Sequence, residues 1–507
     1  MSSENVWTNL IKCIKAVTTK LEPTDHIKGI GFISVAGLVC LDEKGQPVTA
    51  STSNDPNINI ILHYDPRSKL EARTIYKTHH ERLRYRGERL QPDMHESMLM
   101  WLKNNLKENC WDKVGHFMDV TDFLTWKATG SLVRSSCCLS AKWSYVTSLS
   151  GVPSWDAQFF KEIGIPEVAE NDFRKIGSEV QTPGKPLADG LLEAVAKEMK
   201  LPPKLPVATG MTEPYAGCLG LIGCQIPDNI AEDFTSRTCI IVGLTSASHF
   251  IFSREPRFVK GTRGPFRDSV LPNMWLNHAE QTTAESILQF IIDSHPATTV
   301  IKKQIAEMHI HKYLNKILKS MAQKSKQKDR AFLSKHLHIS PDYDGNRCPL
   351  GDPRIRGMFS GLTFSRSQES LALIYLAAMQ SVAYSSRHIS SNFTQFGHDA
   401  RCILIGGNLG KNSVFAQLHK DICQLPIVIP EEPRCMLLGA AILAGVASNY
   451  FHNFKHAMQE MCGLGKLVLP DKDTEVVKYH DKKYEVFLKM YDHQMEYRRI
   501  MGDDVEG

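Results

Sequence analysis

The stretch Cys402-Ile403-Leu404-Ile405-Gly406-Gly407 is an apolar run that ends in two glycines, and Asn408-Leu409-Gly410-Lys411-Asn412 follows it. The apolar residues predict a buried β-strand. Apolar residues at helical spacing after Asn412 predict a helix that begins there. A strand, a glycine turn and a helix N-terminus in succession form a site at which backbone N–H groups can bind a phosphate. This segment therefore predicts an α/β fold with an anion or nucleotide site.

Two other segments share this format, Val207–Gly210 and Cys239–Gly243. A glycine after a buried strand permits positive φ and lets the backbone approach a ligand closely. A plain tight turn explains any one of these segments. All three together, with hydroxyl or amide residues close behind each, favour a phosphate-binding protein.

The rest of the chain also alternates strands with helices. The first helix is expected from the spacing of Val6, Leu10, Ile14 and Val17, with Ser2 or Ser3 as its cap, and a strand is expected over 30–35. Residues 438–445 predict a helix with a face of small residues. Such a face favours the close approach of a planar ligand and of a second helix equally, and both alternatives stay open.

Composition limits the class of protein. The chain has 507 residues, of which 42% are hydrophobic and 23% charged, and this excludes a disordered or fibrous protein. A net charge of +5 gives no reason to expect binding to nucleic acid or to an acidic membrane. The longest apolar or small run, 435–447, is too short to span a bilayer. With no secretory pattern at the N-terminus and no C-x-x-C pair among 13 cysteines, a cytoplasmic protein without disulfides or a zinc ribbon is expected.

Two histidine pairs and one basic run could suggest a metal site and a nucleic-acid site, but both are interpreted as ordinary structural features. The pairs His309-x-His311 and His336-x-His338 have no cysteine or carboxylate that completes a ligand set, so no metal site is predicted from them. The basic run 312–330 contains seven Lys or Arg residues but a single aromatic residue. It is interpreted as the solvated face of a helix and its following loop.

An ordered set of motifs resembles the FGGY carbohydrate kinases, in particular the ribulokinase-like branch. The motifs run along nearly the whole chain: Trp126–Gly130, Ala141–Tyr145, Ala216–Gly223, Pro341–Arg347, Gly357–Leu362, Gly406–Gly407 and Gly439–Ala441. The resemblance implies two actin-like, ribonuclease-H-like ATPase domains around a central cleft. Residues 1–230 would form the sugar-binding domain, 236–450 the nucleotide-binding domain and 451–507 a C-terminal helical extension.

The resemblance also implies a reaction and its residues. The reaction is transfer of the ATP γ-phosphoryl group, with Mg²⁺, to a sugar hydroxyl, which in the nearest branch belongs to D-ribulose. Glu213 stands at the position of the catalytic carboxylate, and no residue is assigned as a metal ligand. The implied sugar contacts are Asp65, Arg67, Lys142 and His278. The implied nucleotide contacts are Gly243, Thr245, Ser246, Gly406, Gly407, Asn412, Gly439 and Ala440.

Several positions depart from the family pattern. The family's Asp-Ala-His-Ala-Gly run begins here with Glu213-Pro214, and Leu244 stands in place of the first glycine of a Gly-Thr-Ser hairpin. The Glu-Gly-Gly-Gln run becomes His278-Ala279-Glu280-Gln281. The Asp-x-Gly-Thr phosphate loop that opens such kinases does not precede the first helix, so the first domain is expected to lack its first strands.

Two functions follow as alternatives. The first is an ATP-dependent kinase of a pentulose such as D-ribulose, slow or impaired in this chain. The second is an inactive pseudokinase that binds nucleotide, sugar or a protein partner, and a scaffold without a ligand is a weaker third. The expected partners are a small sugar and ATP, not nucleic acid or a membrane, and oligomerisation is left open.

Overall fold

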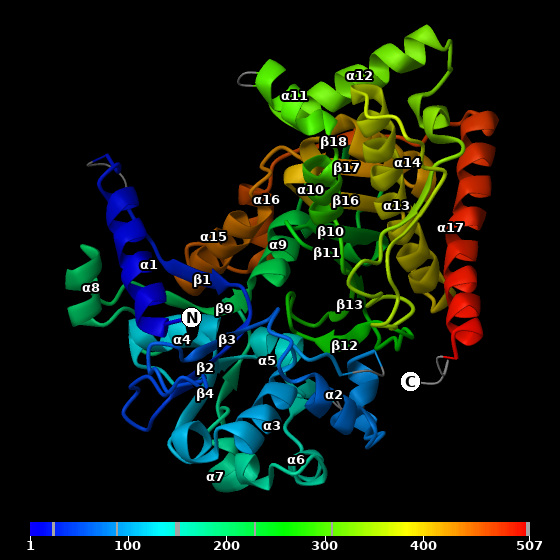
Figure 1. Ribbon diagram of the computed structural model, residues 1–507. Coiled ribbons are helices and arrows are strands. Elements are labelled where there is room, and N and C mark those ends of the chain that lie inside the picture. The colour runs from blue at the N-terminus through cyan, green and yellow to red at the C-terminus, as the bar shows by residue number, and fades with distance from the viewer. Residues whose placement is uncertain (23–25, 88–89, 148–152, 228–229, 306–307, 503–507) are drawn as a thin grey trace.

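The two halves of the chain form two α/β bodies that lie side by side (Figure 1). The computed structural model describes residues 1–22, 26–87, 90–147, 153–227, 230–305 and 308–502. The expected α/β class is confirmed.

The C-terminal half is built on a seven-stranded sheet of order β12-β13-β11-β10-β16-β17-β18. Its centre is parallel, because β16 pairs in parallel with both β10 and β17. The other neighbours pair antiparallel. The strands are β10 (Arg237–Val242), β11 (Ala247–Ser253), β12 (Arg263–Arg267), β13 (Trp275–Gln281), β16 (Cys402–Gly407), β17 (Ile427–Pro430) and β18 (Gly465–Val468).

Helices cover both faces of this sheet. Ile240 and Val242 of β10 belong to one core with α13 and α14, whereas Cys239 and Ile241 belong to a second core with α9 and α15. Successive side chains of β10 point to opposite faces of the sheet, so this one strand contributes to both cores. The helices are α9 (Glu213–Ile222), α10 (Glu285–Ser294), α11 (Ala297–Gln304), α12 (Ile310–Lys324), α13 (Gln368–Gln395), α14 (Ser413–Cys423), α15 (Cys435–Ala447), α16 (Phe454–Met461) and α17 (Thr474–Ile500).

The N-terminal half has smaller sheets. The strand β1 (Ile30–Ser34) pairs in parallel with β9 (Val207–Thr212), and β2 (Gly37–Leu41) lies between antiparallel β3 (Ile60–Leu62) and β4 (His116–Asp119). The helices are α1 (Ser3–Thr18), α2 (Lys69–Tyr76), α3 (His95–Asn105), α4 (Val120–Thr129), α5 (Ser136–Lys142), α6 (Ala157–Glu162), α7 (Glu170–Phe173) and α8 (Glu193–Met199). Short strand pairs complete the described chain: β5 (Arg134–Ser135) with β8 (Val180–Gln181), β6 (Val146–Thr147) with β7 (Pro153–Ser154), and β14 (His338–Ser340) with β15 (Met358–Ser360).

The local predictions near the N-terminus hold in part. The first helix is capped by Ser2, whose side chain accepts a hydrogen bond from the Asn5 amide. The expected strand at 30–35 is β1, and among the described residues it has a strand neighbour on one edge alone, β9. The run 207–210 was wrongly expected to end in a glycine turn. Gly210 lies inside β9, where a Cβ would come within 2.5 Å of the Phe32 carbonyl oxygen, so close contact with β1 explains this glycine.

The helices α9 and α15 join the two halves. A Cβ on Gly439 of α15 would overlap the Ala216 carbonyl of α9, and a Cβ on Gly220 would overlap the Cys435 carbonyl. The helix α15 also lies against β1, since a Cβ on Gly31 of β1 would overlap the Ala440 carbonyl. The small-residue face of residues 438–445 therefore packs against other elements of the fold.

The C-terminal tail packs on the second half. Lys483 of α17 donates to the carbonyls of Ser334 (2.7 Å) and Leu337 (2.8 Å) and to Gln380 Oε1 (3.1 Å). The segment 451–507, expected to be helical, also contains β18. This strand extends the sheet by pairing with β17.

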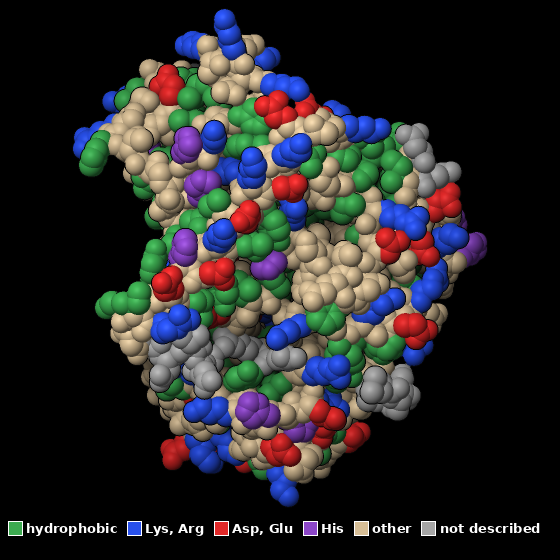
Figure 2. Space-filling model, turned by 90° about the vertical axis from the view of Figure 1, so that its right-hand side faces the viewer, with side chains coloured by type: hydrophobic (Ala, Val, Ile, Leu, Met, Phe, Trp, Pro, Cys, Tyr) green, Lys and Arg blue, Asp and Glu red, His purple; other side chains and the backbone are tan. Residues whose placement is uncertain are grey.

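The basic run contains the expected helix. In α12, Leu314 and Leu318 are buried while Lys312, Lys316 and Lys319 are exposed. Lys and Arg side chains gather over this end of the molecule, as Figure 2 shows. Among the described helices, none combines the length and the apolar character that a membrane span requires.

We expect Gly439→Ala to lower the free energy of unfolding by roughly 2–3 kcal/mol, because the new methyl group would overlap the Ala216 carbonyl and force α15 away from α9. Urea unfolding followed by circular dichroism measures the loss. Leu437→Ala is the matched control, since Leu437 lies on the same helix and is 62% exposed. Equal stability of the two variants would contradict the close contact.

Candidate active site

Two glycine turns lie side by side at one edge of the large sheet. Val242 pairs with Gly407 in the parallel ladder, so the chain leaves β10 and β16 at the same edge. Gly407 has φ of 95°, and a Cβ there would overlap the Val242 carbonyl. The turn therefore needs a residue without a side chain, because the Val242 backbone occupies the space that a Cβ would take.

The hairpin after β10 forms the second turn. The Gly243 amide donates to the Ser246 carbonyl at 2.9 Å. The Thr245 carbonyl accepts from the Ala284 amide (3.0 Å) and from Ser286 Oγ (2.9 Å). These bonds fix the hairpin, whereas the Leu244 side chain is 72% exposed.

The remaining implied nucleotide residues have visible roles in the fold. Asn412 caps α14: its Oδ1 accepts from the Val414 amide (3.1 Å), and its Nδ2 donates to the Tyr375 hydroxyl (2.9 Å). A Cβ on Gly406 would come within 2.7 Å of Cys435 Sγ. Gly439 and Ala440 make the contacts with α9 and β1 described above. Packing requires the absence of a side chain at Gly406 and Gly439. The contact of all these residues with a nucleotide stays a prediction.

Glu213 is the first residue of α9, directly after β9 ends at Thr212. Its carboxylate has no hydrogen-bond or ion-pair partner among the described residues, and burial raises its pKa. Further along α9, Gly217 packs on Ile241 of β10. The helix that begins with Glu213 thus lies against the strand that leads to Gly243.

Of the implied sugar contacts, His278 lies against this helix, and Lys142 lies close enough to His278 to lower its pKa. Lys142, at the end of α5, is buried and donates to Asp93 Oδ2 at 2.6 Å. His278 of β13 stacks on Phe250, with ring centroids 4.4 Å apart. The His278 Nδ1 lies 3.4 Å from the hydroxyl of Tyr215 on α9. Burial first, and then nearby positive charge, keeps the pKa of His278 well below its usual value, so the ring is neutral.

The other two implied sugar contacts bind each other. Arg67 Nη2 lies 2.7 Å from Asp65 Oδ2, and the guanidinium lies over the Trp101 ring at 4.7 Å. None of their hydrogen bonds or ion pairs reaches Lys142, His278 or Glu213 in the described part of the chain. The structure therefore does not join them to the same cluster.

A buried ion network was missed by the sequence analysis. Glu280 Oε2 accepts from Arg263 Nη2 (2.7 Å) and from Arg347 Nη1 (2.8 Å), and Arg347 lies 3.9 Å from Asp93, the partner of Lys142. Burial would raise the pKa of Glu280, but Arg347 and Arg263 outweigh it and hold the pKa well below the usual range. The available signal was Glu280 itself, since a carboxylate in a buried strand needs a cation.

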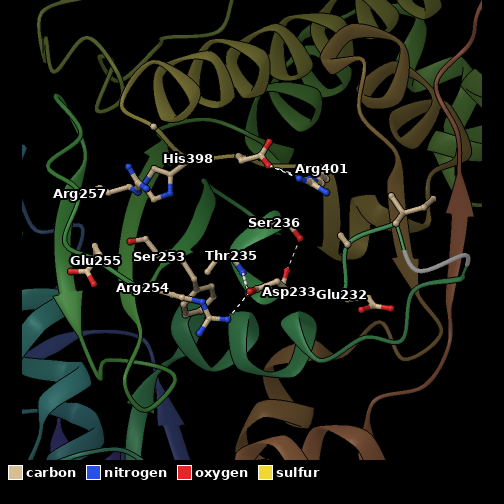
Figure 3. A pocket seen from close by; sticks show the side chains of 15 residues that line it. Glu232, Asp233, Thr235, Ser236, Ser253, Arg254, Glu255, Arg257, His398 and Arg401 are labelled. Carbon is tan, nitrogen blue, oxygen red and sulfur yellow. Dashed lines mark hydrogen bonds and ion pairs between the residues drawn. The ribbon is translucent and has the colours of Figure 1, made fainter.

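A cavity of about 570 Å³ lies at the opposite edge of the same sheet (Figure 3). Two of its lining residues, Ser236 and Arg401, directly precede β10 and β16, whereas the glycine turns follow these strands. Its charges largely pair among themselves, as in Arg254–Asp233 (2.6 Å) and Arg401–Asp399 (3.0 Å). We therefore place the candidate active site at the glycine turns and not in this cavity.

Comparison with known proteins gives consistent matches. Residues 1–220 match the N-terminal domain of the FGGY family of carbohydrate kinases, and residues 239–448 match its C-terminal domain. The chain is 39% identical to an FGGY carbohydrate kinase domain-containing protein of Xenopus laevis, over 99% of this chain and 90% of that protein. It is 30% identical to a D-ribulokinase of Saccharomyces cerevisiae, over 89% of this chain and 66% of that protein.

Solved structures share the fold at low identity. A ligand-bound xylulose kinase from Lactobacillus acidophilus matches with a TM-score of 0.76 and 16% identity, over 97% of this chain and 89% of that one. A glycerol kinase from Plasmodium falciparum with ADP matches with a TM-score of 0.71 and 14% identity, over 97% of this chain and 89% of that one.

We expect Glu280→Ala to lower the free energy of unfolding by roughly 3–5 kcal/mol, because Arg263 would remain buried without its carboxylate. Urea unfolding at neutral pH measures the loss. Asp293→Ala is the control and should leave stability unchanged, since Asp293 pairs with Lys302 in the solvent.

The difference in the free energy of unfolding between wild type and Glu280→Ala is expected to depend on pH. The folded pKa of Glu280 is depressed, so its contribution is present above the unfolded value of roughly 4.3 and is lost as the pH falls toward the folded value. The stability difference between wild type and Glu280→Ala should therefore shrink below pH ~4. A difference that grows on acidification would contradict the ion network.

Proposed function

Because the chain belongs to the FGGY family of carbohydrate kinases, we propose that it transfers the γ-phosphoryl group of ATP to a hydroxyl of a pentulose such as D-ribulose. The similarity to a protein named D-ribulokinase and to proteins named ribulokinase supports this substrate class. The observation that carries the proposal is the pair of glycine turns at one sheet edge, next to the helix that begins with Glu213.

The backbone N–H groups of the two glycine turns suit the phosphates of ATP. Phosphates bind backbone N–H groups most closely where no side chain intervenes, and Gly407 has none. Gly243, Thr245 and Ser246 would present the hairpin to the phosphates on the other side. Bound Mg²⁺ would neutralise charge on the β- and γ-phosphates, as in other phosphoryl transfers.

Glu213 would orient the sugar hydroxyl and accept its proton. A carboxylate acts as a base when it is ionised, and a raised pKa makes it a stronger base near neutral pH. Lys142 and His278 would bind the sugar, with neutral His278 able to donate or accept a hydrogen bond at Nε2, which has no partner among the described residues.

We propose that turnover is slow. Glutamate is one methylene longer than the family's aspartate, and a misplacement of ~1 Å costs ~100-fold in rate. Pro214 restricts the Glu213 backbone, and the Leu244 side chain occupies the hairpin position at which the family has glycine. These substitutions act together on the positioning of the proton and the phosphates.

A pseudokinase is the second candidate, and the buried network favours it. Glu280 places a carboxylate where the family has glycine, and its two arginines hold charge beside the implied sugar contacts. A site filled in this way would bind nucleotide without turnover.

We expect Gly407→Val to abolish the rise in melting temperature that ATP with Mg²⁺ causes, because valine would displace the turn and cover its amides. Differential scanning fluorimetry compares each variant with and without ATP. The control is Gly164→Ala, another glycine with positive φ (81°), where a Cβ would meet nothing within 4 Å. An unchanged ATP response in Gly407→Val would place the nucleotide elsewhere.

We expect turnover with ATP and D-ribulose to stay well below ~1 s⁻¹, to fall further in Glu213→Gln and to rise in Glu213→Asp. In wild type the rate should fall as the pH is lowered through the raised pKa of Glu213, since the protonated acid cannot accept a proton. A coupled assay for ADP release measures all three proteins. ATP binding without any turnover would favour the pseudokinase, and ordinary kinase turnover by wild type would refute the proposed impairment.

A further inference from the structure

The imidazole of His278 is held in place by two other buried aromatic rings. Phe250 lies opposite His278 in the ladder of β11 and β13, and the two rings stack at an interplanar angle of 19°. Tyr215 of α9 meets both rings edge-on, with its centroid 5.0 Å from Phe250 and 5.4 Å from His278. All three side chains are buried. Close packing therefore fixes the imidazole, with Nδ1 toward the Tyr215 hydroxyl.

Tyr215 and His278 can form their hydrogen bond in two ways. Among the described residues, neither the hydroxyl nor the imidazole has another hydrogen-bond partner. If the hydroxyl donates, Nδ1 accepts and the proton of the neutral ring stands on Nε2. If Nδ1 donates instead, the hydroxyl proton and the Nε2 lone pair are both left unbonded. The first arrangement leaves one buried group unbonded and the second leaves two, so the first is favoured.

This choice requires both side chains to be neutral, and burial keeps them so. Burial raises the pKa of Tyr215, so the hydroxyl keeps its proton. Burial first, and then the positive charge of Arg263, lowers the pKa of His278. The imidazole therefore carries one proton, and the hydroxyl of Tyr215 determines which nitrogen holds it.

The opposite nitrogen of the ring lacks a partner. Nε2 of His278 is buried and has no hydrogen-bond partner among the described residues. A buried N–H group without an acceptor is costly, so this atom needs an oxygen from a ligand or from a water. Lys142, the second implied sugar contact of this cluster, lies close enough to act on the charge of His278. A sugar that contacts Lys142 could therefore supply that oxygen.

We propose that Tyr215 is a positioning residue for the sugar: its hydroxyl donates to Nδ1 of His278, and His278 in turn donates from Nε2 to an oxygen of the substrate. The identity of the substrate rests on the proposed function, whereas the hydrogen bond between the two side chains does not. The group that fits Nε2 is an acceptor without positive charge. A carbonyl or hydroxyl oxygen of a ketose meets this requirement.

The full chain labelled with ¹⁵N at histidine tests the hydrogen bond by magnetic resonance. In wild type we expect the proton of His278 on Nε2 and an unprotonated Nδ1 that accepts a hydrogen bond. Tyr215→Phe keeps the ring and removes the donor. Its Nδ1 resonance should move toward the position of a nitrogen without a hydrogen bond. His278→Gln identifies the two resonances by their absence.

Tyr384→Phe is the matched control. The hydroxyl of Tyr384 on α13 lies 2.9 Å from Nδ1 of His480 on α17, and both side chains are buried. Nε2 of His480 also has no partner among the described residues. This variant removes the same kind of hydrogen bond from a pair that contains no implied ligand contact. It should leave the resonances of His278 unchanged.

Titration of D-ribulose without ATP tests the contact with the sugar. The rise in melting temperature gives a dissociation constant for each protein. We expect this constant to increase roughly tenfold in Tyr215→Phe and to stay within about twofold of wild type in Tyr384→Phe, because the first variant alone releases the imidazole that holds the sugar.

Two results would overturn the hydrogen bond: a proton on Nδ1 of His278 in wild type, or an Nδ1 resonance that Tyr215→Phe does not move. Unchanged D-ribulose binding in Tyr215→Phe would show that Nε2 meets a water and not the sugar. Equal weakening in both phenylalanine variants would make the role of Tyr215 merely structural. If wild type itself does not respond to D-ribulose, the proposed substrate fails, and the resonances still decide the hydrogen bond.

Discussion

The contact between α9 and α15 is the constraint on which the rest of the molecule depends. These helices meet through backbone, since a methyl group at Gly439 or Gly220 would overlap a carbonyl of the other helix. Interiors packed at crystal density cannot absorb such an overlap without moving a helix. Because α15 also lies against β1 and α9 carries Glu213 at its first turn, one close contact sets where the candidate base stands relative to the large sheet.

Local patterns predicted the parts of the fold that depend on local chemistry. The run 402–412 gave a strand, a turn and a helix, and Ser2 caps the first helix as expected. Gly210 was misjudged because a glycine that ends a strand and a glycine that lets two strands approach look alike in sequence. The strand β18 was missed because its four residues are held by pairing with β17, a contact that no local pattern contains.

The sequence predicted which residues lie at the candidate site better than it predicted which residues they contact. The resemblance pointed to Lys142 and His278, and the structure places both beside one charged cluster. It could not identify their neighbours, since Asp93, Arg263 and Arg347 come from distant parts of the chain, and spacing in sequence carries no information about such pairs. The one clue in the sequence was the carboxylate of Glu280 within a buried strand. It indicates a cation nearby but does not identify which residue supplies it.

Most ion pairs of this cluster lie within one half of the chain or the other. Asp93 pairs with Lys142 inside the N-terminal half, and Glu280 pairs with Arg263 and Arg347 inside the C-terminal half. Among the ion pairs of the cluster, the one that crosses between the halves is Arg347–Asp93, at 3.9 Å. This separation is longer than those of the ion pairs inside each half, which are 2.6, 2.7 and 2.8 Å. Each half would therefore keep its closest ion pairs if the two halves moved apart.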